Sequence, residues 1–461
     1  MASIHMSKLL IACIIVVALL YSLYFFYRAS GTLNPGKLHI IQLTGLLFFL
    51  QTFVGTALIM LGLDRHYTLD KLADRAGTMQ ITFFVVMAFA VAFPLLLWLF
   101  LRLLRVDPRT DYARYLAETD VCRPRPVLFV LMAAAAAVCI ALMALYFKRI
   151  GYVPLWRLFF HDAAFDTGLE RNRISGLYII HPYVTSIGIH LAIPLLAYFS
   201  FACALSEKKL KWYALAGVLL IAAGLVKTYN FAKSPVIPFL LVYLCIYIYH
   251  RGGIKTRWLV LFGAFSLVVL VAAYVLQGSR LNMMDIYNGI WGRTFFTQVG
   301  TLSYNFELFP TYLPFLRGRS FNRIIMLLLH LPYGQQVRSA RILMEFYGSE
   351  GVFNGTAGVM NSLFIGEAYA NFGWIGLAVS VVWVAFFIAV IFAVVVKTRK
   401  SPAMVTLFAF FTVNAAFTTQ GGFVDFVYNI SWIITFAAMV ICHRLLFFRD
   451  RAAKTSAGVE E

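Results

Sequence analysis

Long apolar runs separated by short polar turns make up most of the chain between residues 8 and 447. A bilayer hydrocarbon core about 30 Å thick is crossed by roughly 20 apolar residues in a helix. Such runs predict about eleven spans, at 8–27, 39–62, 80–104, 127–147, 181–204, 212–227, 236–250, 258–276, 373–396, 402–420 and 428–447. We therefore predict an all-α polytopic membrane protein with two longer segments, 148–180 and 277–372, outside the bilayer.

The spans are predicted to form a single transmembrane domain over residues 6–461. Residues 1–5, MASIH, look like an added leader ahead of a native start at Met6. The apolar run from Leu9 is too long for a signal peptide and lacks a small-residue cleavage site, so we interpret it as the first span. The composition agrees, because 61% of residues are hydrophobic and 13% are charged, about half the charged fraction of soluble domains.

Lysine and arginine gather in turns that fall on one side of the membrane if the spans alternate. These basic turns are 105–126, 208–211, 251–257, 397–400 and the tail 448–461. Because short basic loops stay in the cytoplasm, that side is predicted to be cytoplasmic. The segments 148–180 and 277–372 are then periplasmic loops, the second one large and partly helical. An odd number of spans places the N-terminus outside.

The sixth and seventh spans are short and share the polar interruption KTYNFAKSP, residues 227–235. The pair is compatible with two full spans or with a re-entrant hairpin whose backbone is satisfied by neighbouring helices. Lys227 and Lys233 either anchor a helix end at the interface or mark a binding site inside a helix break. We include Lys233 among the candidate substrate-binding residues.

The net charge of +19 is explained by cytoplasmic anchors, anionic lipid and an outer site for anions. No nucleic-acid-binding motif accompanies it, so we expect no nucleic-acid partner. The six cysteines show no paired spacing, which argues against disulfides or a cysteine metal site. Because phosphate-binding glycine loops, dinucleotide motifs and DxD pairs are missing from the sequence, we expect neither a metal nor a cofactor.

The large loop 277–372 contains seven arginines and no lysine. The arginines are Arg280, Arg293, Arg317, Arg319, Arg323, Arg338 and Arg341. A guanidinium stays charged and grips phosphate oxygens with two parallel hydrogen bonds. Arg280 and Arg293, just beyond the eighth span, are therefore predicted to hold a diphosphate, although each could instead anchor lipid headgroups. Gln298 and Tyr304 are candidates for hydrogen bonds to sugar hydroxyls.

Further along this loop, residues 337–347 predict an amphipathic helix. Arg338, Arg341 and Glu345 would share one face of it, because their spacing follows the helical repeat. This face either lines a substrate groove or carries a solvated Arg341–Glu345 pair. Arg317 and Arg319, in the string LRGRS, are interpreted as flanks of a turn.

The string GEAYANFGWIG, residues 366–376, directly precedes the ninth span. Glu367 would lie at the membrane boundary among aromatic side chains, where burial fits a carboxylate for general-base work. Tyr369 and Asn371 are candidates for substrate contacts beside it. The alternative is that Glu367 pairs with a loop arginine and holds the fold.

The first outer loop offers alternating acids and bases over 161–176, including Asp162, Asp166, Glu170 and Arg173. Such a pattern is usually a solvated, self-paired face, but Asp162 or Asp166 could meet a sugar acceptor, with Arg173 beside it. Asp425, in the last outer turn, is a similar candidate.

The layout and these strings resemble the Wzy-type oligosaccharide repeat-unit polymerases of O-antigen and capsule pathways, within the C-type glycosyltransferase superfamily. The shared features are the span number, the long late outer loop, arginine at its base and the GE-Y-NFG-G string. The resemblance implies a bacterial inner-membrane enzyme that acts on the periplasmic face without a metal. It also implies that Arg280, Arg293 and Glu367 are catalytic, and that Lys233 stands where many relatives carry a basic residue.

Undecaprenyl-diphosphate-linked oligosaccharide would then serve as both donor and acceptor, with membrane lipids around it and a chain-length regulator and a flippase as further partners. Two other functions fit the same layout. An O-antigen ligase would pass finished glycan to lipid A core and relies on a loop histidine. The loop has one, His330, inside an apolar run, which argues mildly against a ligase. A lipid-linked oligosaccharide flippase would need charges along a central cavity, whereas the interiors of these spans carry almost none.

Overall fold

The computed structural model describes residues 7–118, 122, 124–160, 165, 167–232, 234–276, 285–331 and 334–447. Within these ranges the chain is helical, and the only strand-like pairing is an isolated bridge between Pro124 and Phe447. In the described part of the chain, eight helices are long and apolar enough to cross a membrane, and three shorter apolar helices accompany them. The predicted all-α polytopic membrane protein is confirmed.

Each apolar helix or helix group corresponds to one predicted span. In chain order they are α1 (Lys8–Ser30), α2–η2–α3 (Ile40–Met60), α4 (Arg75–Leu103), α6 (Pro126–Ile150), α9–η4–α10 (Pro182–Glu207), α11 (Leu210–Lys227), α12 (Val236–Arg251), α13 (Thr256–Leu276), α19 (Ile365–Lys397), α20 (Pro402–Thr418) and α21–α22 (Val424–Leu446). The sixth and seventh spans are the separate helices α11 and α12, joined through the turn 228–235. A π-helical segment interrupts the second span at η2 (Phe49–Phe53) and the fifth at η4 (Ser186–Leu191).

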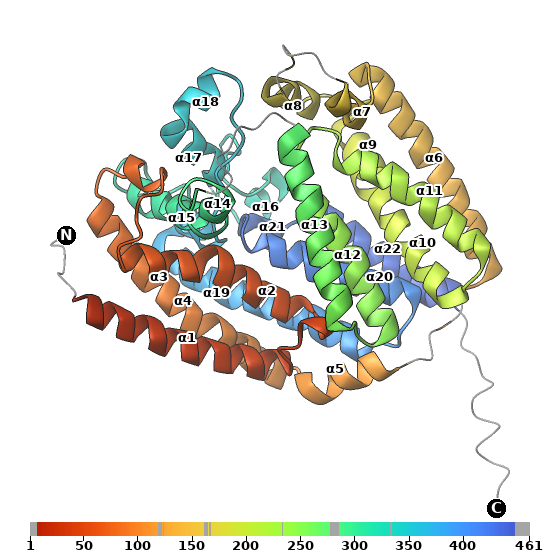
Figure 1. Ribbon diagram of the computed structural model, residues 1–461, viewed down its shortest axis with the longest axis horizontal. Coiled ribbons are helices and arrows are strands. Elements are labelled where there is room, and N and C mark those ends of the chain that lie inside the picture. Colours follow the sequence, from red (N-terminus) through yellow and green to blue (C-terminus); the bar gives the residue numbers. More distant parts are fainter. Residues whose placement is uncertain are drawn as a thin grey trace, which may run out of the picture.

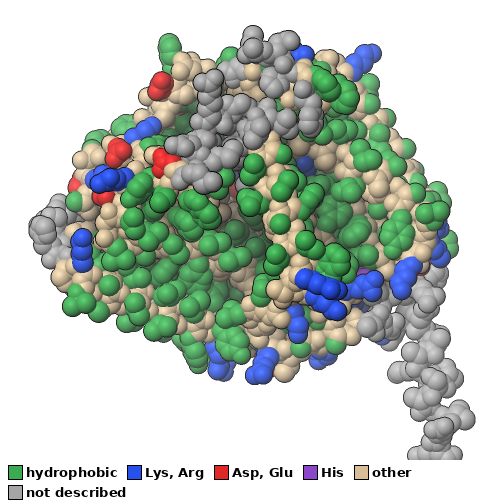
Figure 2. Space-filling view, viewed as in Figure 1, with side chains coloured by type: hydrophobic (Ala, Val, Ile, Leu, Met, Phe, Trp, Pro, Cys, Tyr) green, Lys and Arg blue, Asp and Glu red, His purple; other side chains and the backbone are tan. Residues whose placement is uncertain are grey.

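The helix ends form two opposite faces of the molecule (Figure 1). The basic face carries α5 (Pro108–Ala117) together with the basic turns of the chain. Its segments contact one another: Ile254 N–H donates to Gly36 O at 2.9 Å, and Lys397 Nζ donates to Leu104 O at 2.7 Å. Figure 2 shows Lys and Arg along the lower edge and hydrophobic side chains across the middle. This separation is typical of a membrane belt.

The opposite edge, which we call the loop face, carries the short helices of the two long segments. They are α7 (Pro154–Phe159), α8 (Thr167–Ser175), α14 (Ile290–Phe295), α15 (Thr297–Leu308), α16 (Arg323–Leu328), α17 (Ser339–Tyr347) and α18 (Ser349–Phe353). Helix α15 is buried from Val299 to Leu308 and packs on α4 and α19. The two segments touch where the Asn172 side chain donates to Gly355 O. The loop face is therefore a packed helical layer on the ends of the spans.

Candidate functional site

The ninth apolar helix, α19, has a break near its loop-face end. It begins at Ile365, eight residues earlier than the predicted span, and loses helical geometry at Phe372 and Gly373. Gly373 has φ 61° and ψ −148°, a conformation that side chains other than glycine rarely adopt. An added Cβ there would also meet the Phe315 ring at 3.2 Å. The glycine of the NFG string therefore fixes the break, and Glu367 lies in the short helix before it.

The break frees backbone carbonyls that need new hydrogen-bond partners. Ala370 O accepts from Leu316 N–H and Asn371 O accepts from Arg317 N–H, both at 2.9 Å. The segment 316–320, LRGRS, is thereby held against the end of the short helix. Backbone groups of two segments far apart in sequence thus satisfy each other's hydrogen bonds, and this positions the loop beside Glu367.

The Asn371 side chain completes this attachment. Its Oδ1 accepts from Gly318 N–H at 3.1 Å, and its Nδ2 donates to Ser320 Oγ at 3.0 Å and to Glu367 O at 2.8 Å. Only 1% of Asn371 is exposed. Asn371 therefore joins the loop to the turn that carries Glu367, and its polar atoms are already engaged inside the protein.

A single guanidinium holds two carboxylates at this place. Arg338 Nε lies 2.5 Å from Glu367 Oε1, and its Nη2 lies 3.1 Å from Glu367 Oε2 and 3.0 Å from Asp425 Oδ2. Val424 N–H adds a bond to Glu367 Oε2 at 3.1 Å. The Glu367 side chain is 4% exposed, whereas those of Arg338 and Asp425 are each 34% exposed. Glu367 is thus enclosed, and Asp425 is open to the loop face.

Electrostatics hold this cluster together. Burial lowers the pKa of Arg338, but Glu367 and Asp425 raise it well above its usual value, so the guanidinium stays charged. Gly422 allows the contact, because a Cβ there would lie 2.0 Å from Arg338 Nη2 and 2.4 Å from Glu367 Oε2. The pairing of Glu367 with a loop arginine, one of the two interpretations of the sequence, is present.

Two more arginines stand beside the cluster on the attached loop. Arg317 and Arg319 are exposed, and Arg317 and Gly318 both adopt positive φ, at 49° and 90°. Strained backbone of this kind is often retained at functional sites. Arg319 O accepts from Val337 N–H at 3.0 Å, next to Arg338. The loop therefore adds positive charge to the rim of the site, and Arg317 and Arg319 belong to a turn, as the sequence predicts.

An apolar groove of about 580 Å³ lies between α4 and α19, the helix that carries Glu367. Its wall from α19 starts at Trp374, directly after the break, and continues to Val382. Its wall from α4 runs from Ile81 to Leu96. The Trp374 ring lies 5.0 Å from the Tyr369 ring. The groove thus runs along the membrane-spanning part of both helices and begins on α19 seven residues after Glu367.

Several residues expected to contact substrate have internal partners. Tyr369 is 5% exposed and its ring packs against Phe306 and Phe315. Tyr304 is fully buried; its hydroxyl donates to Thr68 O at 2.6 Å, and its ring stacks on Tyr347 at 3.9 Å. Tyr304 and Tyr369, like Asn371, support the site from within, and their predicted contacts with sugar stay untested.

The predicted diphosphate ligand Arg293 lies on α14. It is exposed and close enough to the buried His66 to lower the pKa of that imidazole, adding to the larger effect of burial. Gln298, half-buried at the start of α15, has an enclosed Oε1 with no hydrogen-bond partner in the described part of the chain. Arg293 and His66 belong to a second polar group on the loop face, in which the His66 ring contacts the hydroxyls of Thr68 and Thr297.

Two predicted binding arginines take part in exposed ion pairs. Arg341 Nε lies 2.8 Å from Glu345 Oε1 with both side chains about half exposed, which is the solvated pair that the sequence offers as one alternative. Arg173 lies 2.8 Å from Glu170, whose pKa is lowered chiefly by that hydrogen bond. Exposed pairs of this kind contribute little stability. Neither arginine joins the Arg338 cluster.

Other candidates lie outside the described residues. They are Arg280, Asp162, Asp166 and Lys233, together with the leader 1–5 and the tail 448–461. Within the described ranges, no group of three or more His, Cys, Asp or Glu is arranged to hold a metal ion. Comparison of the chain with protein-family models, curated proteins and solved structures found no match.

Proposed function

We propose that this protein is a metal-independent glycosyltransferase that polymerises oligosaccharide repeat units carried on a polyprenyl diphosphate such as undecaprenyl diphosphate. The observation that supports it is the Arg338–Glu367–Asp425 cluster on the loop face, whose Glu367 belongs to the same helix, α19, that lines an apolar groove with α4. A lipid-linked sugar needs such a combination, with its chain along apolar helices and its diphosphate and sugars among polar groups. The loop face would then be periplasmic, in a bacterial inner membrane.

In this proposal a hydroxyl of the acceptor sugar attacks the anomeric carbon of the donor. The new C–O bond forms as the bond to the diphosphate breaks, and the hydroxyl proton passes to a carboxylate. Arg338 donates hydrogen bonds to both carboxylates. We assign this base role to Asp425 in preference to Glu367, because Asp425 is partly exposed on the loop face while Glu367 is enclosed. Glu367 would instead hold Arg338 in position.

The leaving diphosphate gains negative charge as its bond breaks, so cations near it lower the barrier. Arg317 and Arg319 are the exposed arginines on the loop attached to the cluster. Arg293, and Arg280 at the entry of the same segment, remain the arginines expected from sequence to share this role. A chain-length regulator and a flippase are also proposed as partners, because the resemblance to Wzy-type polymerases implies them.

Turnover of a defined lipid-linked repeat unit by the purified protein, with and without chelator, tests the proposal. Arg338→Lys should reduce chain extension roughly a hundredfold, because a lysine cannot bridge two carboxylates as a planar fork does. Arg75→Lys is the matched control, since Arg75 also bridges two acids, Asp64 and Asp70, on the loop face. If both variants gave the same distribution of glycan chain lengths at equal protein level, the Arg338 cluster would not be the active site.

An O-antigen ligase is the second candidate, because His330 is exposed on the loop face just after α16. A deletion strain separates the two functions. Loss of a polymerase leaves core lipid capped with single repeat units, whereas loss of a ligase leaves the core without any repeat.

A further inference from the structure

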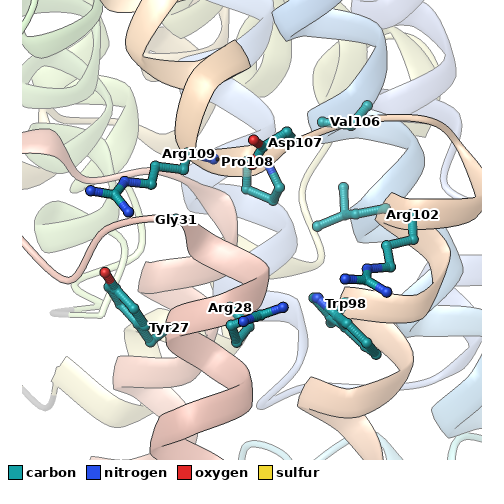
Figure 3. Close-up of a pocket in the computed structure, with 10 residues that line it drawn as sticks. Tyr27, Arg28, Gly31, Trp98, Arg102, Val106, Asp107, Pro108 and Arg109 are labelled. Carbon is teal, nitrogen blue, oxygen red and sulfur yellow. Dashed lines mark hydrogen bonds between the residues drawn. The ribbon is translucent and has the colours of Figure 1, made fainter.

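A pocket of about 400 Å³ lies on the basic face, far from the Arg338 cluster, where α1 and α4 end and α5 begins. Figure 3 shows Arg28 of α1 and Arg102 of α4 reaching toward one another beside Trp98. Arg109 extends over Gly31 at the other end of the pocket (Figure 3). A Cβ on Gly31 would lie 2.5 Å from Arg109 N, so the two backbones are closely apposed and build this wall.

Two positive charges share one aromatic ring in this pocket. The Arg102 guanidinium carbon lies 4.1 Å from the Trp98 ring centroid, and that of Arg28 lies 5.7 Å from it. Within the described chain, no carboxylate comes within ion-pair distance of either arginine. Asp107, the acid in the wall, accepts a hydrogen bond from Arg109 N–H at 3.1 Å. Two close guanidiniums without a counter-ion suit a shared anion.

The same helix pair continues into an apolar groove. This groove, about 760 Å³, is lined by α1 from Cys13 to Tyr21 and by α4 from Phe84 to Val91. Aromatic rings connect it to the pocket: Tyr21 lies 4.6 Å from Phe25, which lies 5.6 Å from Trp98. A cationic pocket at the end of an apolar groove matches a lipid with a charged head and a hydrocarbon tail.

We propose that Arg28 and Arg102 bind the phosphate of an anionic phospholipid whose acyl chain lies in the α1–α4 groove. The site would hold membrane lipid and would be distinct from the loop-face site for substrate. Trp98 would lie at the headgroup level, where tryptophan is favoured at membrane interfaces. A soluble phosphate compound carries the same phosphate group as the lipid. The experiments below therefore compare a phospholipid with a soluble phosphate compound.

Native mass spectrometry of the full chain in mild detergent measures the site directly. Phosphatidylglycerol should be retained over phosphatidylcholine, and Arg28→Gln/Arg102→Gln should reduce phosphatidylglycerol retention roughly 25-fold, at about fivefold per arginine. Arg105→Gln/Arg257→Gln is the matched control, because both arginines are exposed on the basic face outside the pocket. That control should change retention less than twofold.

A second variant tests the tail and the source of the phosphate. Val17 is 66% exposed in the groove, so Val17→Trp should fill the groove without disturbing the fold and should weaken phosphatidylglycerol retention. Inorganic pyrophosphate, the soluble probe, should compete weakly and be unaffected by Val17→Trp. Equal losses in the arginine variant and its control, no preference for phosphatidylglycerol, or pyrophosphate competition as strong as that of the lipid would each overturn the proposal.

Discussion

At the scale of single residues, the pairing of Arg338 decides how the candidate site is organised. Its guanidinium faces two carboxylates that are not equivalent, since Glu367 is enclosed and also accepts from Val424 N–H, while Asp425 is bound through Arg338 and is partly exposed. Removing one partner of a buried ion pair leaves an uncompensated charge and is strongly destabilising. The two acids should therefore respond differently to neutral substitution.

Asp425→Asn should abolish chain extension and leave thermal unfolding nearly unchanged, because the amide keeps the shape but cannot accept the proton. Glu367→Gln should lower both, with a loss of stability of about 3 kcal/mol, because Arg338 loses its buried counter-charge. Turnover with a lipid-linked repeat unit and thermal unfolding in detergent measure the two effects. Full turnover in Asp425→Asn, with loss confined to Glu367→Gln, would return the base role to Glu367.

His66 gives the loop face a dependence on pH. Burial lowers the pKa of this imidazole from 6.5 to about 4, so an unfolded chain takes up its proton at higher pH than the folded one. The contribution to stability is complete above about pH 6.5 and is lost as pH falls toward 4. Between pH 7 and pH 5 the loss should be roughly 2 kcal/mol.

Thermal unfolding of the purified protein at pH 7 and pH 5 measures this loss. His66→Gln should reduce the difference between the two values, since glutamine does not titrate. An unchanged difference in the variant would show that other groups cause the pH response.

The sequence predicts some of these residues but not their partners. Glu367 stands out as an acid at a span boundary, and an arginine partner is one of its expected interpretations. The sequence does not predict that this partner is Arg338, because 29 positions separate Arg338 from Glu367 and 87 separate it from Asp425. Periodicity reports neighbours within a helix, whereas this cluster is formed by packing between elements.

At the scale of elements, hydrophobic length predicts the spans well because each must cross the same bilayer. Irregular backbone is harder to predict. The break in α19 depends on Gly373, and the π-helical segment η2 has no signal in apolar periodicity. The sequence predicts a partly helical long loop segment, but the burial of α15 follows from close backbone contacts that only the structure shows.

Gly55, just after η2, makes one of these contacts. A Cβ at this position would lie 1.8 Å from Phe295 O, at the end of α14. Gly55→Ala should therefore displace α14 from its packing position against the second span. We expect a loss of stability of about 1–3 kcal/mol, measured by thermal unfolding. Gly217→Ala in α11 is the control, because nothing lies within 4 Å of its added Cβ, and it should be neutral or slightly stabilising. A neutral Gly55→Ala would contradict the close packing.

At the scale of the whole molecule, the distribution of charge and the fold agree. Turns that the alternation of spans places together do meet in space: Ile254 contacts Gly36 on the basic face, and Asn172 contacts Gly355 on the loop face. This grouping requires each predicted span to cross the bilayer once. One span added or missed would have placed turns of the basic face and the loop face on the same side. The direction of the bundle in its membrane rests on the excess of basic residues alone.

Single cysteines on the two faces test that direction. Asn354→Cys places a thiol on the loop face, and Lys255→Cys places one on the basic face, both at exposed positions. In intact cells with a permeable outer membrane, a thiol reagent that does not cross the inner membrane should label the first and spare the second. Lysed cells should label both. Because lysine and arginine in short loops stay cytoplasmic, the reverse pattern would turn the Arg338 cluster toward the cytoplasm and exclude a periplasmic polymerase.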